Sequence, residues 1–212
     1  MIKVSVSSLP YNDNIIENLS TIIQSGADFL HLDIMDGSLT QNKTFLSDKV
    51  KEINSITTFF LDCHLMINEP SEVVKQYVKA GVNILTIHYE AFKNKQELIN
   101  ILTYLKSKKV IVGLSVLPST KLEEIKDYEN YCDLLLIMSV EIGKYGQSFI
   151  EEIYSKIENA RKIFKDKLIE VDGGINLENI EKLKNLGVDI VVVGGSFFKS
   201  ENKTEFITNL KK

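Results

Sequence analysis

A histidine and an aspartate stand two residues apart in a segment that is otherwise typical of a buried strand. In "DFLHLDIMDGS", residues 28–38, His31 and Asp33 interrupt an apolar run. Side chains at positions i and i+2 of a strand point to the same face. Because a buried ionisable group costs free energy unless it is paired or bound to a metal, this pattern predicts either a solvated face or a nearby positive charge.

The remaining histidines and a second aspartate extend this pattern. The chain has three histidines, His31, His64 and His88, and each lies near the C-terminal end of an apolar run. Asp33 ends one such run and Asp172 ends another, in "EVDGG". Two imidazoles and two carboxylates that converge could bind one divalent ion. Mixed nitrogen and oxygen ligands suit zinc, iron(II), manganese or cobalt, and the sequence does not choose among them.

Glycine-rich segments follow two later apolar runs. They are "DGG" at 172–174 and "GGS" at 194–196. Glycines allow backbone N–H groups to approach an anion closely. In a barrel of parallel strands, the loops after the seventh and eighth strands commonly bind phosphate. We therefore expect these two segments to bind a phosphate group.

Three methionines occupy similar positions in their segments. Met35, Met66 and Met138 each stand at the end of an apolar run. Filling gaps in the core is the usual role of methionine. Their shared position at one end of the predicted strands is equally consistent with a soft apolar lining over the site.

Eight apolar runs alternate with eight amphipathic segments along the chain. Three short repeats, "SGAD" at 25–28, "AGVN" at 80–83 and "LGVD" at 186–189, each follow a helical pattern and precede an apolar run. Such repeats are typical of a left-handed glycine that ends a helix before a buried strand. The predicted strands span 3–7, 28–33, 59–65, 83–88, 109–116, 133–138, 168–172 and 189–194. The predicted helices span 13–25, 45–55, 70–80, 94–107, 120–128, 149–165, 176–186 and 202–210.

This alternation predicts an α/β protein, a (β/α)8 TIM barrel that forms a single domain over residues 1–212. The 212 residues leave about 26 for each of eight units, which is compact but sufficient. The runs are apolar on both faces, as expected for parallel strands that helices cover. A doubly wound open sheet is the competing architecture, and the lack of a G-x-G-x-x-G motif after the first strand weakens it.

Composition and charge exclude several classes of partner. The chain is 44% hydrophobic with a net charge of −4, and without a basic stripe we expect no nucleic-acid partner. No apolar run approaches the ~18 residues of a membrane span, so we expect no membrane partner either. The two cysteines, Cys63 and Cys132, do not form a disulfide framework, which favours a reducing, cytoplasmic location. Cys63 points away from its neighbours Asp62 and His64 and is not expected to bind metal.

Six motifs together resemble the ribulose-phosphate 3-epimerase family. They are "HLDIMDG", "LDCHLM", "IHYEA", "GQSF", "EVDGG" and "VVGGSFF", and the resemblance covers nearly the whole chain. It implies a (β/α)8 barrel and an isomerase of the pentose phosphate pathway. The implied reaction is metal-dependent 3-epimerisation of a ketose phosphate, with D-ribulose 5-phosphate to D-xylulose 5-phosphate as the first expectation. Proton transfer between two carboxylates would pass through an enediolate. The implied partner is a small sugar phosphate, and we also expect a homo-oligomer.

The resemblance also implies roles for individual residues. The implied ligands of the divalent ion are His31, Asp33, His64 and Asp172, and Asp33 and Asp172 are also the implied acid and base. The implied substrate contacts are Ser7, His64, Met35, Met66, Met138, Gly146, Gly173, Gly174, Gly194 and Gly195.

Three segments depart from the family's usual pattern. Val6 stands where the family usually has proline, and residues 38–41 read "SLTQ" in place of His-Phe-Val-Pro. Residues 141–147 read "EIGKYGQ" in place of Asn-Pro-Gly-Phe-Gly-Gly-Gln. That loop is the family's lid over the substrate, so we expect Lys144 and Tyr145 to affect its flexibility or the charge near the phosphate. These changes bear on substrate choice more than on reaction type.

Two other functions stay open at this point. One is 3-epimerisation of a hexulose phosphate such as D-allulose 6-phosphate, and the other is a non-catalytic sugar-phosphate-binding paralogue. A neighbouring barrel group, the phosphate-binding decarboxylases and hexulose-phosphate synthases, carries Asp-x-Lys-x-x-Asp on its third strand. His64 stands where that lysine would be, so we set this group aside.

Overall fold

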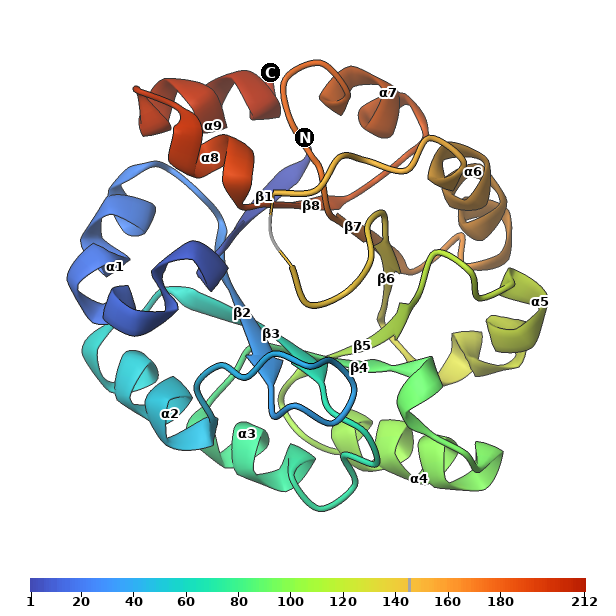
Figure 1. The fold of residues 1–212 in the computed structure, drawn as a ribbon. Coiled ribbons are helices and arrows are strands. Elements are labelled where there is room, and N and C mark those ends of the chain that lie inside the picture. Colours follow the sequence, from blue (N-terminus) through green and yellow to red (C-terminus); the bar gives the residue numbers. More distant parts are fainter. Residues whose placement is uncertain (145) are drawn as a thin grey trace.

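Eight parallel strands close into a barrel (Figure 1). The structure is a computed structural model that describes residues 1–144 and 146–212, so the expectation for Tyr145 lies outside the described residues. The strand order follows the chain, and β1 closes on β8 with Lys3 beside Ile190. The strands are β1 Lys3–Ser7, β2 Phe29–Met35, β3 Phe60–Met66, β4 Ile84–His88, β5 Ile111–Val116, β6 Leu134–Met138, β7 Leu168–Asp172 and β8 Ile190–Val193. The predicted TIM barrel is confirmed, and the alternative prediction of a doubly wound open sheet is wrong.

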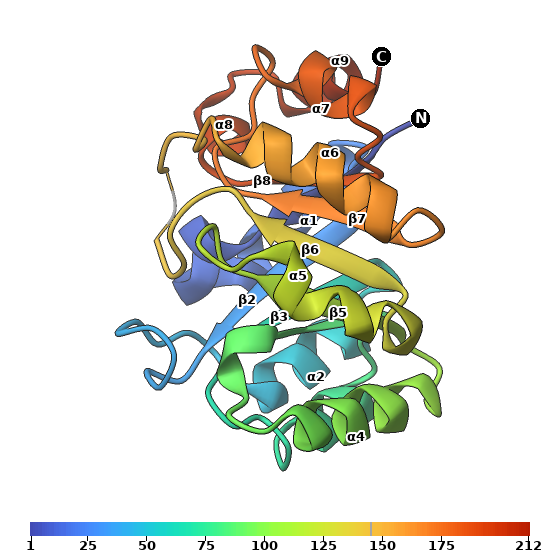
Figure 2. The same cartoon turned by 90° about the vertical axis from the view of Figure 1, so that its right-hand side faces the viewer.

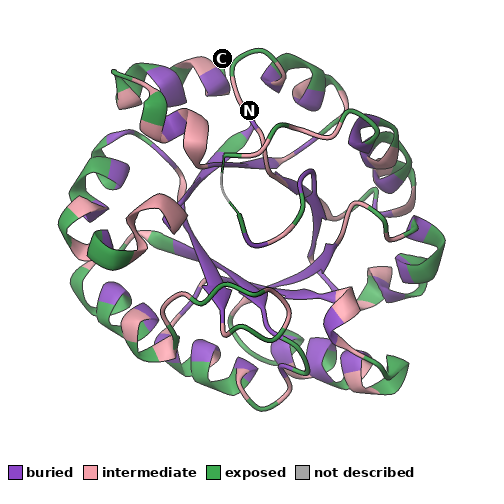
Figure 3. Ribbon diagram, in the orientation of Figure 1, coloured by how far each residue is buried: buried purple, intermediate pink, exposed green. Residues whose placement is uncertain are grey.

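Helices surround the barrel, and their buried residues face the strands (Figure 3). The α-helices are α1 Ile15–Gln24, α2 Ser47–Ile56, α3 Val74–Ala80, α4 Lys95–Lys106, α5 Leu122–Ile125, α6 Ile153–Ile163, α7 Ile180–Asn185, α8 Gly195–Lys199 and α9 Lys203–Lys211. In α1 the buried residues Ile15, Leu19 and Ile22 follow the spacing of one helix face. Within the described residues, no helix has both the length and the apolar character that crossing a membrane requires.

Several helices are shorter than their hydrophobic patterns predicted. The helix predicted over 176–186 begins only at Ile180, because the Asn176 side chain accepts hydrogen bonds from the N–H groups of Glu178 and Asn179. Such side-chain turns compete with helix formation. The segment predicted over 120–128 divides into α5 and the 3-10 helix η3. The sequence missed α8 and the 3-10 helices because they are too short to show periodicity. The 3-10 helices are η1 Leu9–Asn14, η2 Tyr89–Ala91 and η3 Lys126–Tyr131.

The three repeated turns have the predicted left-handed glycines. Gly26, Gly81 and Gly187 have φ angles of 84°, 88° and 78°. Each follows α1, α3 or α7 and leads into the next strand. Only glycine adopts this conformation without strain, so these positions end the helices as predicted.

The interior of the barrel contains both an apolar cluster and a group of buried polar side chains. β4, β6 and β8 supply a buried apolar cluster that includes Ile84, Leu134, Leu136 and Ile190. β1, β2, β3 and β7 supply the buried polar residues Ser5, His31, Asp62 and Glu170. The larger apolar core lies between barrel and helices, and it contains Cys63, which confirms that this side chain faces away from the barrel interior.

The only arginine of the chain joins segments at the end of the barrel opposite the strand C-termini. Arg161 on α6 donates to Lys167 O at 2.8 Å and Gly187 O at 2.6 Å, and it pairs with Asp189. We expect Arg161→Lys to lower the free energy of unfolding in urea by about 2 kcal/mol, because an ammonium cannot reach all these acceptors. The control Lys162→Ala removes one exposed ion pair with Glu158 and should cost less than about 0.5 kcal/mol. Equal losses for the two variants would contradict this role.

Candidate active site

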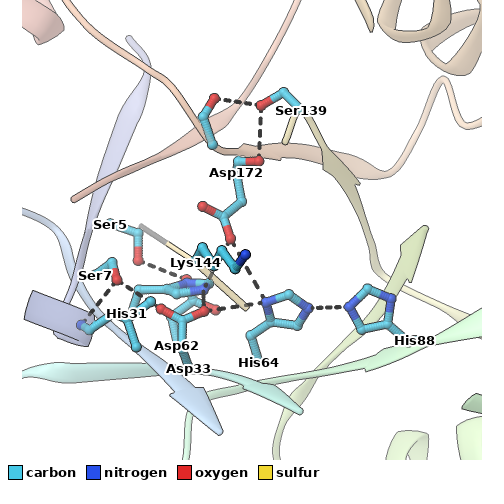
Figure 4. A network of polar contacts seen from close by, with 12 residues as sticks. Ser5, Ser7, His31, Asp33, Asp62, His64, His88, Ser139, Lys144 and Asp172 are labelled. Carbon is cyan, nitrogen blue, oxygen red and sulfur yellow. Dashed lines mark hydrogen bonds and ion pairs between the residues drawn. The ribbon is translucent and has the colours of Figure 1, made fainter. Parts of the chain in front are cut away.

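Four side chains from three strands converge at the mouth of the barrel (Figure 4). β2 supplies His31 and Asp33, β3 supplies His64, and β7 supplies Asp172. His31 Nε2 lies 3.4 Å from Asp33 Oδ1 and 3.8 Å from Asp172 Oδ2. His64 Nδ1 lies 3.7 Å and 3.9 Å from the same two oxygens. The structure therefore brings together all four residues that the sequence analysis expected to share a cation.

The donor atoms of this cluster fit a single divalent ion. His31 Nε2 and His64 Nδ1 are buried and have no hydrogen-bond partner among the described residues. Leaving a buried polar atom unpartnered costs about 1–3 kcal/mol, and a cation between the four groups would remove that cost. Donors separated by 3.4–3.9 Å can surround one ion at the usual ligand distances of about 2.0–2.2 Å. The cluster could therefore bind one metal ion, and its chemistry does not select which one.

The two carboxylates of the cluster have different proton affinities. Burial raises the pKa of Asp172 to about 7, the negative charges of Asp33 and Asp62 add to this effect, and His31 opposes it. Burial also acts on Asp33, but His31 and His64 outweigh it and hold the pKa of Asp33 well below its usual range. Without a cation, one carboxylate is thus charged and the other is partly protonated near neutral pH. Metal binding would release the Asp172 proton.

The two imidazoles also differ. Burial lowers the pKa of His64 to about 4, and the neighbouring His88 and His31 contribute to the shift. Burial acts in the same direction on His31, but the charges of Asp62 and Asp33 outweigh it and raise the pKa of His31 well above its usual value. His64 is therefore neutral near pH 7, as a metal ligand must be.

Serine hydroxyls and a further aspartate orient the cluster. Asp62 Oδ2 lies 2.7 Å from His31 Nδ1 and accepts from Ser5 Oγ at 2.7 Å. Ser7 Oγ donates to Asp33 Oδ2 at 2.8 Å. These contacts leave His31 Nε2 and Asp33 Oδ1 to face the centre of the cluster.

Sequence reasoning missed the supporting roles of several buried polar residues. Glu170 lies beside Asp62, and its burial raises the pKa of Glu170 well above its usual value, with the charge of Asp62 adding to the effect. His88 contacts both His64 and Glu90. For Glu170 a signal was present, because it stands two residues before Asp172 in the same predicted strand. The same two-residue spacing had identified His31 and Asp33. Glu90 lies beyond its strand, in η2, and the strand period gave no signal for it.

A cavity of about 60 Å³ lies above the cluster. Its walls include Asp33 and Asp172 together with two of the three methionines, Met66 and Met138. Met35 is fully buried and is not part of the cavity wall. The loop after β2 folds back at this point, where the Thr44 N–H donates to Met35 O at 2.9 Å. The three methionines are therefore not equivalent, although their positions in the sequence are.

The predicted glycines meet on one side of this cavity. Ser7 and all five glycines lie in its wall: Gly146, Gly173, Gly174, Gly194 and Gly195. Gly174 has a φ of 67°, and a Cβ there would lie 2.3 Å from the backbone nitrogen of Phe149. A Cβ on Gly195 would lie 3.3 Å from Gly146 Cα. The loops after β6, β7 and β8 thus pack backbone against backbone, which requires residues without side chains.

Two segments that depart from the family pattern touch each other across the mouth. The Asn42 side chain donates to Gly143 O, and a Cβ on Gly143 would lie 3.1 Å from Thr40 Cβ. Lys144 lies in the cavity wall. Figure 2 shows both loops extending from the same end of the barrel, away from the N-terminus. The changes at 38–41 and at 141–144 therefore affect one surface, the cover of the cavity.

The fold and this arrangement define a class of protein. It is a TIM barrel with a candidate metal cluster and a cradle of glycines at the C-terminal mouth, where such barrels place their active sites. The 3-keto-L-gulonate-6-phosphate decarboxylase of Vibrio cholerae is similar in structure, with a TM-score of 0.74 and 10% identity over 100% of this chain and 95% of that one. This likeness supports the fold alone.

Residues 1–198 match the ribulose-phosphate 3 epimerase family, and the chain belongs to that family of isomerases. It is 33% identical to the ribulose-phosphate 3-epimerase of Schizosaccharomyces pombe over 201 residues, which cover 93% of this chain and 87% of the relative. It is 36% identical to the ribulose-phosphate 3-epimerase, cytoplasmic isoform, of Oryza sativa over 203 residues, or 94% and 88% of the two chains. The resemblance drawn from the six motifs is confirmed.

Proposed function

We propose that this chain is a metal-dependent 3-epimerase that interconverts D-ribulose 5-phosphate and D-xylulose 5-phosphate. Its family membership supports epimerisation of a pentulose phosphate. The observation that carries the mechanism is the pair of carboxylates, Asp33 and Asp172, which come from strands on different sides of the barrel and both line the cavity. Inverting a carbon needs proton removal on one face and proton delivery on the other.

Asp33 and Asp172 act as the base and the acid in this proposal, and they exchange roles with the direction of reaction. Removal of the C3 proton leaves an enediolate, which the carboxylic acid on the opposite face then protonates at C3. His31, Asp33, His64 and Asp172 would hold the divalent cation. The bound cation supplies Lewis-acid stabilisation of negative charge on the substrate oxygens.

The remaining cavity residues position the substrate. The backbone N–H groups of the glycine loops bind the phosphate, which fixes the far end of the sugar and places C3 between the carboxylates. Ser7 orients Asp33 through its hydrogen bond. Met66 and Met138 give the cavity an apolar wall that limits water near the reacting carbon. Lys144 lies in the wall of this cavity and would face the bound sugar phosphate.

Epimerisation of a hexulose phosphate is the competing function, because the cover of the cavity is where this chain departs from its family. The test is turnover of D-ribulose 5-phosphate and D-allulose 6-phosphate in D2O, with the metal content of the same sample measured by mass spectrometry. We expect deuterium at C3 of the pentulose, at a rate proportional to the metal bound. Faster deuterium exchange into D-allulose 6-phosphate would show that the hexulose phosphate is the substrate. Exchange that does not depend on the bound metal would exclude the proposed mechanism.

We also propose a cytoplasmic location and a homo-oligomeric state. The cysteines Cys63 and Cys132 are both buried and unpaired, which agrees with a reducing compartment. Light scattering of the purified protein tests the oligomeric state, which stays a prediction from the sequence.

A further inference from the structure

The second ring nitrogen of His64 contacts another histidine. His64 Nε2 lies 2.9 Å from His88 Nε2, and both side chains are fully buried. The ring centroids are 4.8 Å apart and the ring planes differ by 28°, and Figure 4 shows His88 on the side of His64 that faces away from Asp172. Two neutral imidazole nitrogens at this distance share one proton, so one of them donates and the other accepts.

The direction of this hydrogen bond follows from Glu90. His88 Nδ1 lies 3.1 Å from Glu90 Oε2. The other oxygen, Glu90 Oε1, accepts from Leu117 N–H at 2.8 Å and from the Thr120 hydroxyl. Burial opposes ionisation of Glu90, but its contacts with His88, Thr120 and Leu117 outweigh this effect and lower the pKa of Glu90 below its usual value. Glu90 is therefore an ionised carboxylate, and both of its oxygens can only accept.

The proton positions along the chain of contacts are then determined. With one proton on each imidazole, His88 Nδ1 carries the proton of its ring and donates a hydrogen bond to Glu90 Oε2, which leaves His88 Nε2 as an acceptor. His64 Nε2 must therefore donate to His88 Nε2. The remaining nitrogen, His64 Nδ1, keeps its lone pair, and this is the atom that faces Asp33 and Asp172.

We propose that Glu90 and His88 are positioning residues that keep the proton of His64 on Nε2, so that Nδ1 presents a lone pair to the divalent cation. This inference rests on the proposed function only in assigning a cation to the cluster. The contacts of His64 differ from those of His31, because His31 Nδ1 lies directly against the carboxylate of Asp62, at 2.7 Å. At His64, the orienting carboxylate acts through an additional imidazole.

Glu90→Gln should reverse the proton positions without removing any heavy atom. The fixed Leu117 N–H requires the amide oxygen of the glutamine on its side, which turns the NH2 group toward His88 Nδ1. His88 Nδ1 must then accept, so His88 Nε2 carries the proton and donates to His64 Nε2. His64 is left with its proton on Nδ1, inside the metal cluster.

The experiment compares wild type, Glu90→Gln and two controls. Thr120→Val removes one donor to Glu90 but leaves the carboxylate, and Glu97→Gln makes the same charge change at a carboxylate that accepts from Ser71 instead. The tautomers of His64 and His88 are read from nitrogen-15 NMR of the metal-free proteins. Zinc affinity is measured by competition with a chromophoric chelator.

In the wild type we expect the His64 proton on Nε2, and in Glu90→Gln we expect it on Nδ1. Zinc affinity should fall 10- to 100-fold in that variant alone, which is the usual effect of removing a hydrogen-bond partner of a metal ligand. A wild-type spectrum with the proton on Nδ1 would overturn the inference even if the variant does not fold. An unchanged tautomer and zinc affinity in Glu90→Gln would also overturn it. Neither readout uses substrate, so a lack of epimerase activity would count against the proposed function alone.

Discussion

Asp172→Asn should reduce epimerisation of D-ribulose 5-phosphate by at least about 1000-fold, near the upper part of the range for removal of a general acid–base group. The amide has nearly the same shape as the carboxylate but cannot take up or deliver the proton. Because the Asp172 side chain is at the mouth and 16% exposed, the barrel should stay folded. Turnover is measured at saturating zinc, with thermal unfolding followed by circular dichroism in parallel.

A matched substitution and an exchange assay make this result specific. Asp166→Asn changes the same residue type in the exposed turn before β7, at the opposite end of the same strand, and should leave turnover unchanged. In Asp172→Asn, Asp33 can still exchange the C3 proton on its own face, so deuterium should enter one epimer only. Asp33→Asn should show exchange of the other epimer. Exchange of both epimers by either variant would show that the two carboxylates do not divide the faces of the sugar.

Gly174→Ala should lower kcat/KM for D-ribulose 5-phosphate about 100-fold, which corresponds to about 2.8 kcal/mol. The loss should appear mainly as a higher KM. A Cβ at this position would lie 2.3 Å from Phe149 N and 2.8 Å from Phe149 Cα, so the backbone at Phe149 must shift. That shift separates the glycine loops that bind the phosphate in the proposed mechanism. Steady-state kinetics and inhibition by inorganic phosphate measure the effect.

Gly187→Ala is the control for the backbone conformation. Gly187 has a φ of 78°, close to the 67° of Gly174, but a Cβ there would meet only Arg161, with Nε at 3.4 Å. Both variants should lose about 1 kcal/mol of stability for placing alanine in the left-handed region. Only Gly174→Ala should lose phosphate affinity. Similar kinetics for the two variants would mean that the loops do not bind the phosphate through close backbone packing.

The sequence by itself determined those features that depend on neighbouring residues. The observed strands agree with the apolar runs to within two residues at each end, because a strand covered on both faces must be apolar throughout. The two-residue period of a strand placed His31 beside Asp33 and turned Cys63 away from the interior. The left-handed glycines that end α1, α3 and α7 follow from backbone sterics alone.

Only the tertiary structure decided which of these local features meet. Asp33 and Asp172 lie far apart in the chain, and closure of β1 on β8 brings their strands to one mouth. Met35 has the same local pattern as Met66, yet it does not line the cavity, and the loop after β2 returns to its backbone oxygen. The contact from His64 through His88 to Glu90 depends on loops after two other strands. Periodicity describes the face to which a side chain points, whereas its neighbours on that face depend on register and closure between distant segments.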